Sequence, residues 1–420
     1  MINILILKGN FVYTEKPEEY TIKEKSYLVV EDGVVKEFYD LLPAMYDGCE
    51  ITDYGDSIII PGFIDLHLHA GQYLQRGMGM TKELLEWLND YTYILEAKFK
   101  DREFAEAVYA KFVKELARYG TTRCCVYSSS SLIGTEVLIK AFKERGLYAY
   151  VGKVDMDRNA PEYITVDCKT SLEETEYLLN KYGDEEMVKP IITPRFAPTS
   201  TEKQLDGLGK LASKYNAKVQ SHISESKKEL EWVKELYPER DSYTDVYEHY
   251  NLLKPNDTLM AHAIHLDDSE IEIMKRKEIR LVHCPDSNIN VRSGIMPIKK
   301  YMSHDMKLGL GTDIAGGHKI AMNEAIVRAV QLSKIDCVVN EKDDYLSITE
   351  AFYLATKGGG EFFGKVGSFE PGYEFDALVI GYDSLMEDLY SVSDRLEKFL
   401  YTGDDRFIEE VYVRGNIIKR

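Results

Sequence analysis

The sequence has 420 residues, with 52 Lys and Arg against 71 Asp and Glu, so its formal net charge is −19. This charge repels phosphate backbones and anionic lipid surfaces, and no basic tract offsets it, which argues against nucleic acid and membranes as partners. With 44% hydrophobic residues, only 12 prolines and six cysteines that form no C-x-x-C pair, the chain is typical of a globular protein with reduced thiols. We therefore expect a cytoplasmic location.

Short β-like runs separated by turns fill the first 60 residues, at 3–7, 26–30 and 57–60. From residue 61 to about residue 335, apolar strand-like runs alternate with amphipathic helical stretches. Eight strands are predicted, at residues 63–67, 121–127, 148–154, 190–195, 218–222, 258–262, 280–283 and 307–313. The helices predicted between them include residues 104–119, 136–145, 172–182, 202–215 and 226–236.

This alternation predicts an α/β fold. The connections are too long for hairpins, and the span matches the ~250 residues of a (β/α)8 TIM barrel. A doubly wound sheet is the alternative, but it rarely contains eight such units without a glycine fingerprint after its first strand. The β pattern returns at 376–380 and 408–413. We therefore expect a barrel over residues 61–365 and one small β-sandwich domain composed of residues 1–60 and 366–420.

Polar side chains with metal-binding chemistry interrupt the first predicted barrel strand. Asp65, His67 and His69 alternate with apolar residues, so the strand period of two places all three on one face. Two imidazoles buried in an apolar run need a compensating partner, and a metal ion is one. The motif alone is equally compatible with two structural histidines.

Other strand ends favour the metal. His222, His262, His283 and Asp313 each lie at the end of a predicted strand, and barrel active sites gather at the carboxyl ends of the strands. Three neutral imidazoles and a carboxylate suit Zn²⁺ or Fe²⁺ and leave a position open for water. The sequence does not discriminate between these two metals.

Glu225 stands three residues beyond His222, close to the expected metal but not on the same strand. This placement favours a general acid or base. A structural alternative is that Ser224 caps the following helix and Glu225 lies in its first turn, where a carboxylate is favourable. Both interpretations remain open.

Several motifs together carry a resemblance over nearly the whole chain. They are Pro61-Gly62-Phe63-Ile64-Asp65-Leu66-His67-Leu68-His69, His69-Ala70-Gly71-Gln72-Tyr73, Leu85-Glu86-Trp87-Leu88, Thr193-Pro194-Arg195-Phe196, Gln220-Ser221-His222-Ile223-Ser224-Glu225 and Gly309-Leu310-Gly311-Thr312-Asp313. The chain resembles the amidohydrolase superfamily and, within it, the guanine deaminase family. Three positions depart from the relatives' pattern, namely Gly71, His265 and Asp286.

The resemblance implies hydrolytic deamination of guanine to xanthine and ammonia by a metal-activated water, as a step of purine catabolism. It implies one zinc per chain, with iron possible, and a homodimer. It assigns the metal ligands, the residues that move protons and the residues that bind the base. The ligands are His67, His69, His222 and Asp313; Glu225, Asp313 and His262 are catalytic; and Gln72, Arg195 and Phe196 bind the substrate.

Three alternatives stay open at this stage. A sister deaminase would act on another purine, a pyrimidine or a triazine. A two-metal hydrolase of cyclic amides would need a bridging carboxylated lysine, for which Lys153 is the one loose candidate. An inactive barrel kept as a binding or assembly protein would be expected to have lost metal ligands, whereas here each ligand position is filled.

Overall fold

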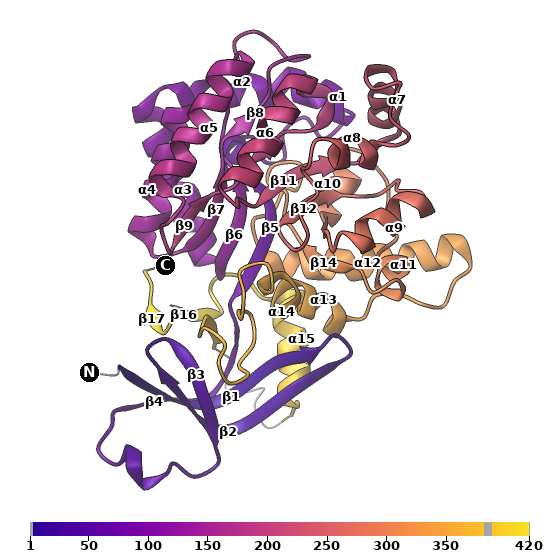
Figure 1. The fold of residues 1–420 in the computed structure, drawn as a ribbon. Coiled ribbons are helices and arrows are strands. Elements are labelled where there is room, and N and C mark those ends of the chain that lie inside the picture. Colours follow the sequence, from indigo (N-terminus) through magenta and orange to yellow (C-terminus); the bar gives the residue numbers. More distant parts are fainter. Residues whose placement is uncertain (1–2, 382–388, 420) are drawn as a thin grey trace.

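The computed structural model describes residues 3–381 and 389–419. Both ends of the chain contribute to one mixed seven-stranded sheet, in the order β17-β16-β15-β4-β1-β2-β3 (Figure 1). Its strands are β1 (Ile4–Lys16), β2 (Glu19–Glu31), β3 (Val34–Tyr39), β4 (Ile51–Pro61), β15 (Ala377–Ile380), β16 (Ile408–Val413) and β17 (Asn416–Ile417). Because these strands form a single hydrogen-bonded sheet, the expected β-sandwich is not confirmed.

The two ends of the chain meet where β15 pairs antiparallel with β4, with Ala377 opposite Pro61. On its other side β4 runs parallel to β1. A cluster of buried aromatic side chains, including Phe11, Phe369 and Phe375, lies against this sheet. Helix α15 (Val392–Thr402) was not predicted from the sequence. It begins after the cap residue Ser391 and lies between β15 and β16 along the chain.

Parallel strands form the larger part of the molecule and confirm the predicted α/β class. One four-stranded sheet has the order β5-β6-β7-β9, a second has the order β11-β12-β13-β14, and β8 pairs with β10. The strands are β5 (Phe63–His69), β6 (Thr121–Tyr127), β7 (Tyr148–Gly152), β8 (Val154–Asp155), β9 (Val188–Pro190), β10 (Thr193–Pro194), β11 (Val219–Ile223), β12 (Thr258–His262), β13 (Arg280–His283) and β14 (Lys307–Leu310).

The edges of the two larger sheets are linked by backbone hydrogen bonds. The Gln220 N–H donates to the Ile192 carbonyl at 2.9 Å, and the Asp313 N–H donates to the His67 carbonyl at 2.8 Å. Because the strands nevertheless form separate sheets, a closed eight-stranded barrel is not confirmed.

Three predicted strands are shorter than expected or divided. The segment 148–154 breaks at Lys153. The segment 190–195 breaks after Pro190, where the Ile191 N–H donates to the Val151 carbonyl of β7 but the Ile192 N–H donates to the Lys218 carbonyl before β11, so the chain changes its partner strand. Strand β14 ends before Asp313, whose φ of 48° is incompatible with extended backbone. Arg195 and Asp313 therefore lie on loops that follow the ends of β10 and β14.

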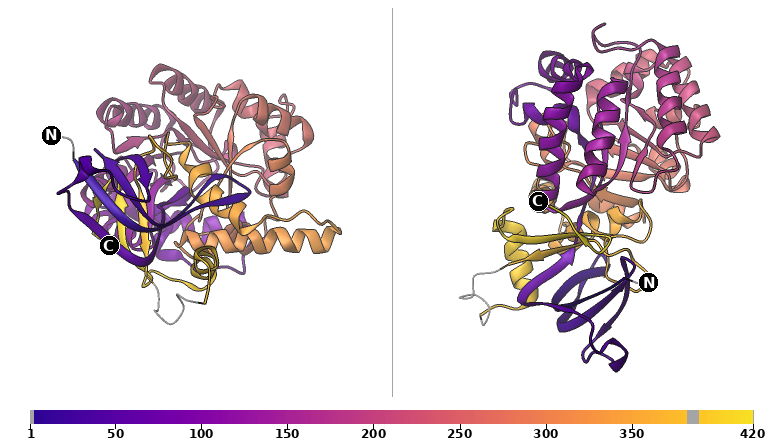
Figure 2. Two further views of the ribbon diagram at one scale, coloured as in Figure 1. Left: turned by 90° about the horizontal axis from the view of Figure 1, so that it is seen from below. Right: turned by 90° about the vertical axis from the view of Figure 1, so that its left-hand side faces the viewer.

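Helices cover the outside of the parallel strands (Figure 2). They are α3 (Arg102–Arg118), α4 (Leu132–Arg145), α5 (Cys168–Tyr182), α6 (Glu202–Lys214), α7 (Lys227–Leu236), α8 (Tyr243–His249), α9 (Asp268–Arg276), α10 (Pro285–Asn290), α11 (Ile298–Ser303), α12 (Met322–Asn340), α13 (Ile348–Ala355) and α14 (Lys357–Gly360). In α6, for example, Leu205, Leu208 and Ala212 are fully buried, as the helical period predicts.

A run of short helical turns connects β5 to α3 and lies beside the carboxyl ends of the parallel strands (Figure 1). It comprises η2 (Ala70–Gln75), α1 (Leu84–Trp87), the π-helical η3 (Leu88–Thr92), α2 (Tyr93–Glu96) and η4 (Ala97–Lys100). None of the helices within residues 3–381 and 389–419 combines the length and apolar character needed to cross a lipid bilayer. All six cysteines are free thiols.

Candidate active site

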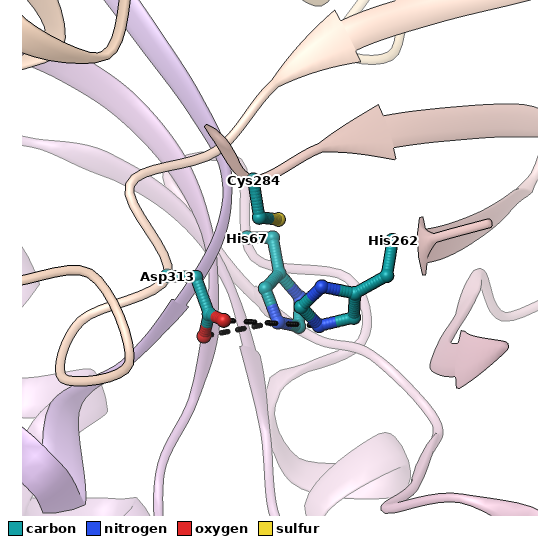
Figure 3. Close-up of side chains that lie close together, drawn as sticks. All are labelled: His67, His262, Cys284 and Asp313. Atoms are coloured by element: carbon teal, nitrogen blue, oxygen red, sulfur yellow. Dashed lines mark ion pairs between the residues drawn. The ribbon is translucent and has the colours of Figure 1, made fainter. Parts of the chain in front are cut away.

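Histidine side chains from three strands meet at the carboxyl ends of the parallel strands. Potential ligand atoms of His67, His69 and His222 lie within 4.8 Å of one another. A second, overlapping group combines His67, His262, Cys284 and Asp313 (Figure 3). The structure thus brings together the four expected ligands and His262, whereas His283 belongs to neither group.

Hydrogen bonds at the far side of two rings determine which nitrogen faces this group. The His222 Nδ1–H donates to the Arg195 carbonyl at 2.6 Å, and the His262 Nδ1–H donates to the Asn288 amide oxygen at 2.9 Å. In its neutral form, each ring therefore presents an unprotonated Nε2. The Nε2 atoms of His69 and His222 lie 3.2 Å apart. Among the described residues the buried Nε2 of His67 has no hydrogen-bond partner, and it lies 3.3 Å from the Asp313 carboxylate.

Burial keeps most of these imidazoles neutral. Desolvation, reinforced by the neighbouring His67, holds the pKa values of His69 and His222 well below the ordinary value. Burial opposes ionisation of Asp313, but His67, at 3.3 Å, and the other imidazoles lower its pKa to about 2. Neutral imidazoles with an orphaned nitrogen beside an ionised carboxylate are a donor set that fits a divalent cation such as Zn²⁺ or Fe²⁺.

Glu225 is buried beside this group, with 4% of its surface exposed. Its Oε2 lies 3.6 Å from the His262 Nε2, and its Oε1 accepts a hydrogen bond from the Ser293 hydroxyl at 3.2 Å. Burial raises the pKa of Glu225 to about 7, a value suited to taking up and releasing a proton near neutral pH. For His262, burial lowers the pKa, but Glu225 and Asp313 outweigh it and raise the pKa overall.

The structural alternative for Glu225 is wrong in its details. Helix α7 is capped by Ser226, not by Ser224, and begins at Lys227. Ser226 forms a capping box with Glu229, so a different carboxylate serves the helix terminus. Glu225 precedes the helix and turns toward the imidazoles, and no helix-capping role remains for it.

A cavity opens beside these groups. Its apolar walls include Leu84, Trp87 and Leu88 from the run of short helices, and Phe196, whose ring meets Trp232 edge to face at 6.0 Å. Gln72 and Arg195 supply polar atoms to the same cavity. All three residues expected to bind the substrate therefore line one cavity together with three of the expected metal ligands, His69, His222 and Asp313.

Sequence reasoning missed two polar residues around this cavity. Asn288 holds the His262 ring, as described above. Glu96 accepts hydrogen bonds from Gln72 at 2.9 Å and from Arg195 at 2.9 and 3.1 Å. Glu96 is one glutamate among many in a helical stretch, so no local pattern distinguishes it.

A model described as the amidohydrolase family matches residues 58–418 of this chain. The chain belongs to this family. It is 42% identical over 390 residues to the guanine deaminase of Mus musculus, covering 87% of this chain and 84% of that protein. It is 40% identical over 381 residues to the guanine deaminase of Dictyostelium discoideum, covering 88% of this chain and 84% of that protein.

Among solved structures, the chain is similar to a guanine deaminase from C. acetobutylicum described with guanine bound in the active site. The two are 46% identical with a TM-score of 0.97, over 99% of this chain and 100% of the other. Family membership and this overlap confirm the resemblance that the sequence motifs indicated.

Each of the three residues that depart from the family pattern makes defined local contacts. A Cβ on Gly71 would lie 2.8 Å from the Ser128 carbonyl, so a larger residue there requires a shift of the loop. Asp286 pairs with Arg328 at 2.9 Å, which gives its carboxylate a partner. His265 places its Nε2 3.0 Å from the Ser293 carbonyl.

Lys153 is engaged in a way that argues against a two-metal member of this amidohydrolase family. Its buried amine lies 2.8 Å from the Asp155 carboxylate and donates to the Ser171 hydroxyl at 3.1 Å. An amine that both of these side chains engage is not free to form a carbamate. The bridging lysine of a two-metal site would be expected at the end of the fourth predicted strand, where Arg195 stands instead.

Proposed function

We infer that this chain is a guanine deaminase, which hydrolyses guanine to xanthine and ammonia. The observation that carries this conclusion is the similarity to the guanine-bound C. acetobutylicum enzyme over essentially both whole chains. The cavity supports it independently, because a cluster of metal-binding side chains, a buried carboxyl and polar groups line the same space.

We propose that His67, His69, His222 and Asp313 hold one zinc ion, with iron as the alternative metal. The metal would activate the water that attacks C2 of guanine. The chain's own contribution is to keep the imidazoles neutral through burial and to hold the His222 ring through the Arg195 carbonyl. In this proposal Asp313 accepts a proton at its carboxylate, and His262, held by Asn288, orients the water.

Glu225 is proposed to deliver protons to the base. Its buried carboxyl, with a pKa of about 7, can protonate a ring nitrogen and then pass a proton to the departing amine. Gln72 and Arg195 are proposed to donate hydrogen bonds to the carbonyl edge of guanine, and Phe196 to pack on the ring. A site of this kind discriminates against bases that lack the carbonyl.

The finer description of the fold is part of the proposal. Residues 61–365 would form a (β/α)8 barrel, supported by the hydrogen bonds that link the edges of the two parallel sheets. Residues 1–60 and 366–420 would form the composite β domain, supported by the pairing of β4 with β15. We further propose a cytoplasmic homodimer acting in purine catabolism; the free thiols agree with a reducing compartment.

The test is ammonia release from a panel of nucleobases, measured with the purified protein together with its metal content. Guanine should be deaminated at least 100-fold faster than adenine, because adenine offers an amine where the site offers donors and carries no amine at C2. Comparable rates with guanine and adenine would contradict the assignment, and two metal ions per chain would contradict the single-metal centre.

A further inference from the structure

The carboxylate of Glu96 connects two of the polar residues that line the cavity, Gln72 and Arg195, without lining the cavity itself. Glu96 is the last residue of α2 and is 1% exposed. Its Oε1 accepts from the Gln72 side-chain amide at 2.9 Å, and both of its oxygens accept from Nη1 of Arg195 at 2.9 and 3.1 Å. Gln72 follows β5 and Arg195 follows β10, so one side chain connects residues from two strand ends.

These contacts fix which way the Gln72 amide points. An ionised carboxylate only accepts hydrogen bonds, so the Gln72 nitrogen must face Glu96. The backbone N–H of Ala315 only donates, and it donates to the Gln72 oxygen at 3.2 Å. With its oxygen and one N–H engaged, Gln72 has one N–H left to offer to the cavity.

Arg195 is oriented in a similar way. Its guanidinium carries five N–H groups, and Nη1 is directed at Glu96. The group also lies over the Tyr93 ring at 5.3 Å, which restricts its rotation. The remaining N–H groups, on Nε and Nη2, are donors only, and the positive charge is balanced by Glu96.

We propose that Glu96 is a positioning residue that sets base specificity by holding Gln72 and Arg195 as a donor-only edge. Such an edge selects an uncharged base that presents adjacent acceptors, such as a purine carbonyl and the neighbouring ring nitrogen. A base with an amine at this edge places donor against donor and is rejected. This inference rests on the proposed function, since it assumes that Gln72 and Arg195 contact the base.

The decisive variant is Glu96→Gln, which keeps the shape but introduces a donor, so that the Gln72 amide can reverse. The readout is competitive inhibition by hypoxanthine, which keeps the carbonyl, and by purine, which lacks it. In the variant, hypoxanthine should bind about 10- to 100-fold more weakly, the scale of a charge-assisted hydrogen bond, whereas purine should change by less than about threefold. Equal weakening of both inhibitors, or of neither, would overturn the proposal.

A double-mutant cycle separates positioning from a general effect on stability. If Glu96 acts largely through Arg195, then adding Glu96→Gln to the Arg195→Met variant should weaken hypoxanthine binding by less than about a further threefold. Fully additive losses would show that Glu96 acts independently of Arg195. If Glu96→Gln does not fold, Glu96→Asp is the second variant, because it keeps the negative charge on a shorter side chain. It should show an intermediate loss of hypoxanthine binding and retain purine binding.

Asp376→Asn is the matched control, because it disrupts another buried arginine–carboxylate pair, with Arg123, at the seven-stranded sheet. This variant should lower Tm and leave the ratio of the two inhibition constants unchanged. If the unaltered protein releases no ammonia from guanine, the proposed function fails. If it does, and Glu96→Gln keeps the wild-type preference for hypoxanthine, the role of Glu96 alone is refuted.

Discussion

A buried imidazole can bind a metal only if its lone pair is free and its ring is held in place. His222 and His262 meet both conditions, because each donates its Nδ1–H to a fixed oxygen, from Arg195 and Asn288 respectively. The Arg195 backbone therefore holds an expected metal ligand while its side chain faces the cavity. At this residue the proposed metal centre and the proposed base-binding site share one support.

Glu225→Gln tests the proton-transfer role. The amide keeps the size of the side chain but cannot carry a proton, so turnover should fall by about 10²- to 10⁴-fold. Because Glu225 is not an expected ligand, metal content should not change. Ammonia release and metal analysis on the same preparation check both statements, and near-native turnover would remove Glu225 from the mechanism.

Arg195→Lys tests recognition of the carbonyl edge. Lysine replaces a planar set of donors by a single charged amine, and it cannot satisfy Glu96 and the base at once. The kcat/KM for guanine should fall about 10- to 100-fold with unchanged metal content, since the Arg195 carbonyl that holds His222 is retained. Loss of the metal in this variant would instead indicate that the guanidinium supports the metal centre.

At the scale of elements, the seven-stranded sheet is tied to β6 by one buried ion pair. The Arg123 Nε lies 2.7 Å from the Asp376 carboxylate, and its guanidinium also reaches Glu374 at 2.6 Å. The Tyr148 ring lies 4.3 Å beneath the guanidinium. This contact joins segments from distant parts of the sequence and lies at the amino ends of the parallel strands, away from the cavity.

Arg123→Met should therefore destabilise the protein without changing its chemistry. Removing one partner leaves the Asp376 carboxylate buried and unpaired, which costs about 3–5 kcal/mol of unfolding free energy. Denaturant unfolding measures this loss, and kcat per folded molecule should stay at the wild-type value. The double variant Arg123→Met with Asp376→Asn should recover part of the stability; no recovery would mean that the loss comes from packing.

For the whole molecule, metal binding and stability are linked. The expected ligands come from β5, β11 and the loop after β14, so an ion bound there bridges both parallel sheets. A metal that binds only the folded state stabilises it by about 2.7 kcal/mol when free metal is about 100 times Kd. The ligand cluster should thus contribute to the stability of the complete fold as well as to turnover.

Removal of the metal by a chelator should accordingly lower Tm by several degrees and abolish ammonia release. Added Zn²⁺ should restore both. In His67→Ala and His222→Ala, each lacking one ligand, the Zn²⁺-dependent rise in Tm should be absent or much reduced. A full Zn²⁺ response in both variants would contradict the proposed ligand set.

Local patterns were enough to predict most of the parallel strands. Strands β6, β12 and β13 have the predicted bounds, because a buried strand is a continuous apolar run that ends where polar residues begin. The alternation around His67 and His69 likewise predicted one shared face, since strand periodicity is a local property. The family motifs extended these predictions to the reaction.

The tertiary structure alone decided how residues from different strand ends meet. Nothing near Glu96 in the sequence indicates that it lies between Gln72 and Arg195, because that contact depends on how the short helices after β5 fold back over the strand ends. The same holds for Ser226, which caps α7 in place of Ser224 while Glu225 turns inward. Periodicity and propensity act over a few residues, whereas these contacts arise only when distant segments pack against one another, and that packing selects among locally similar side chains.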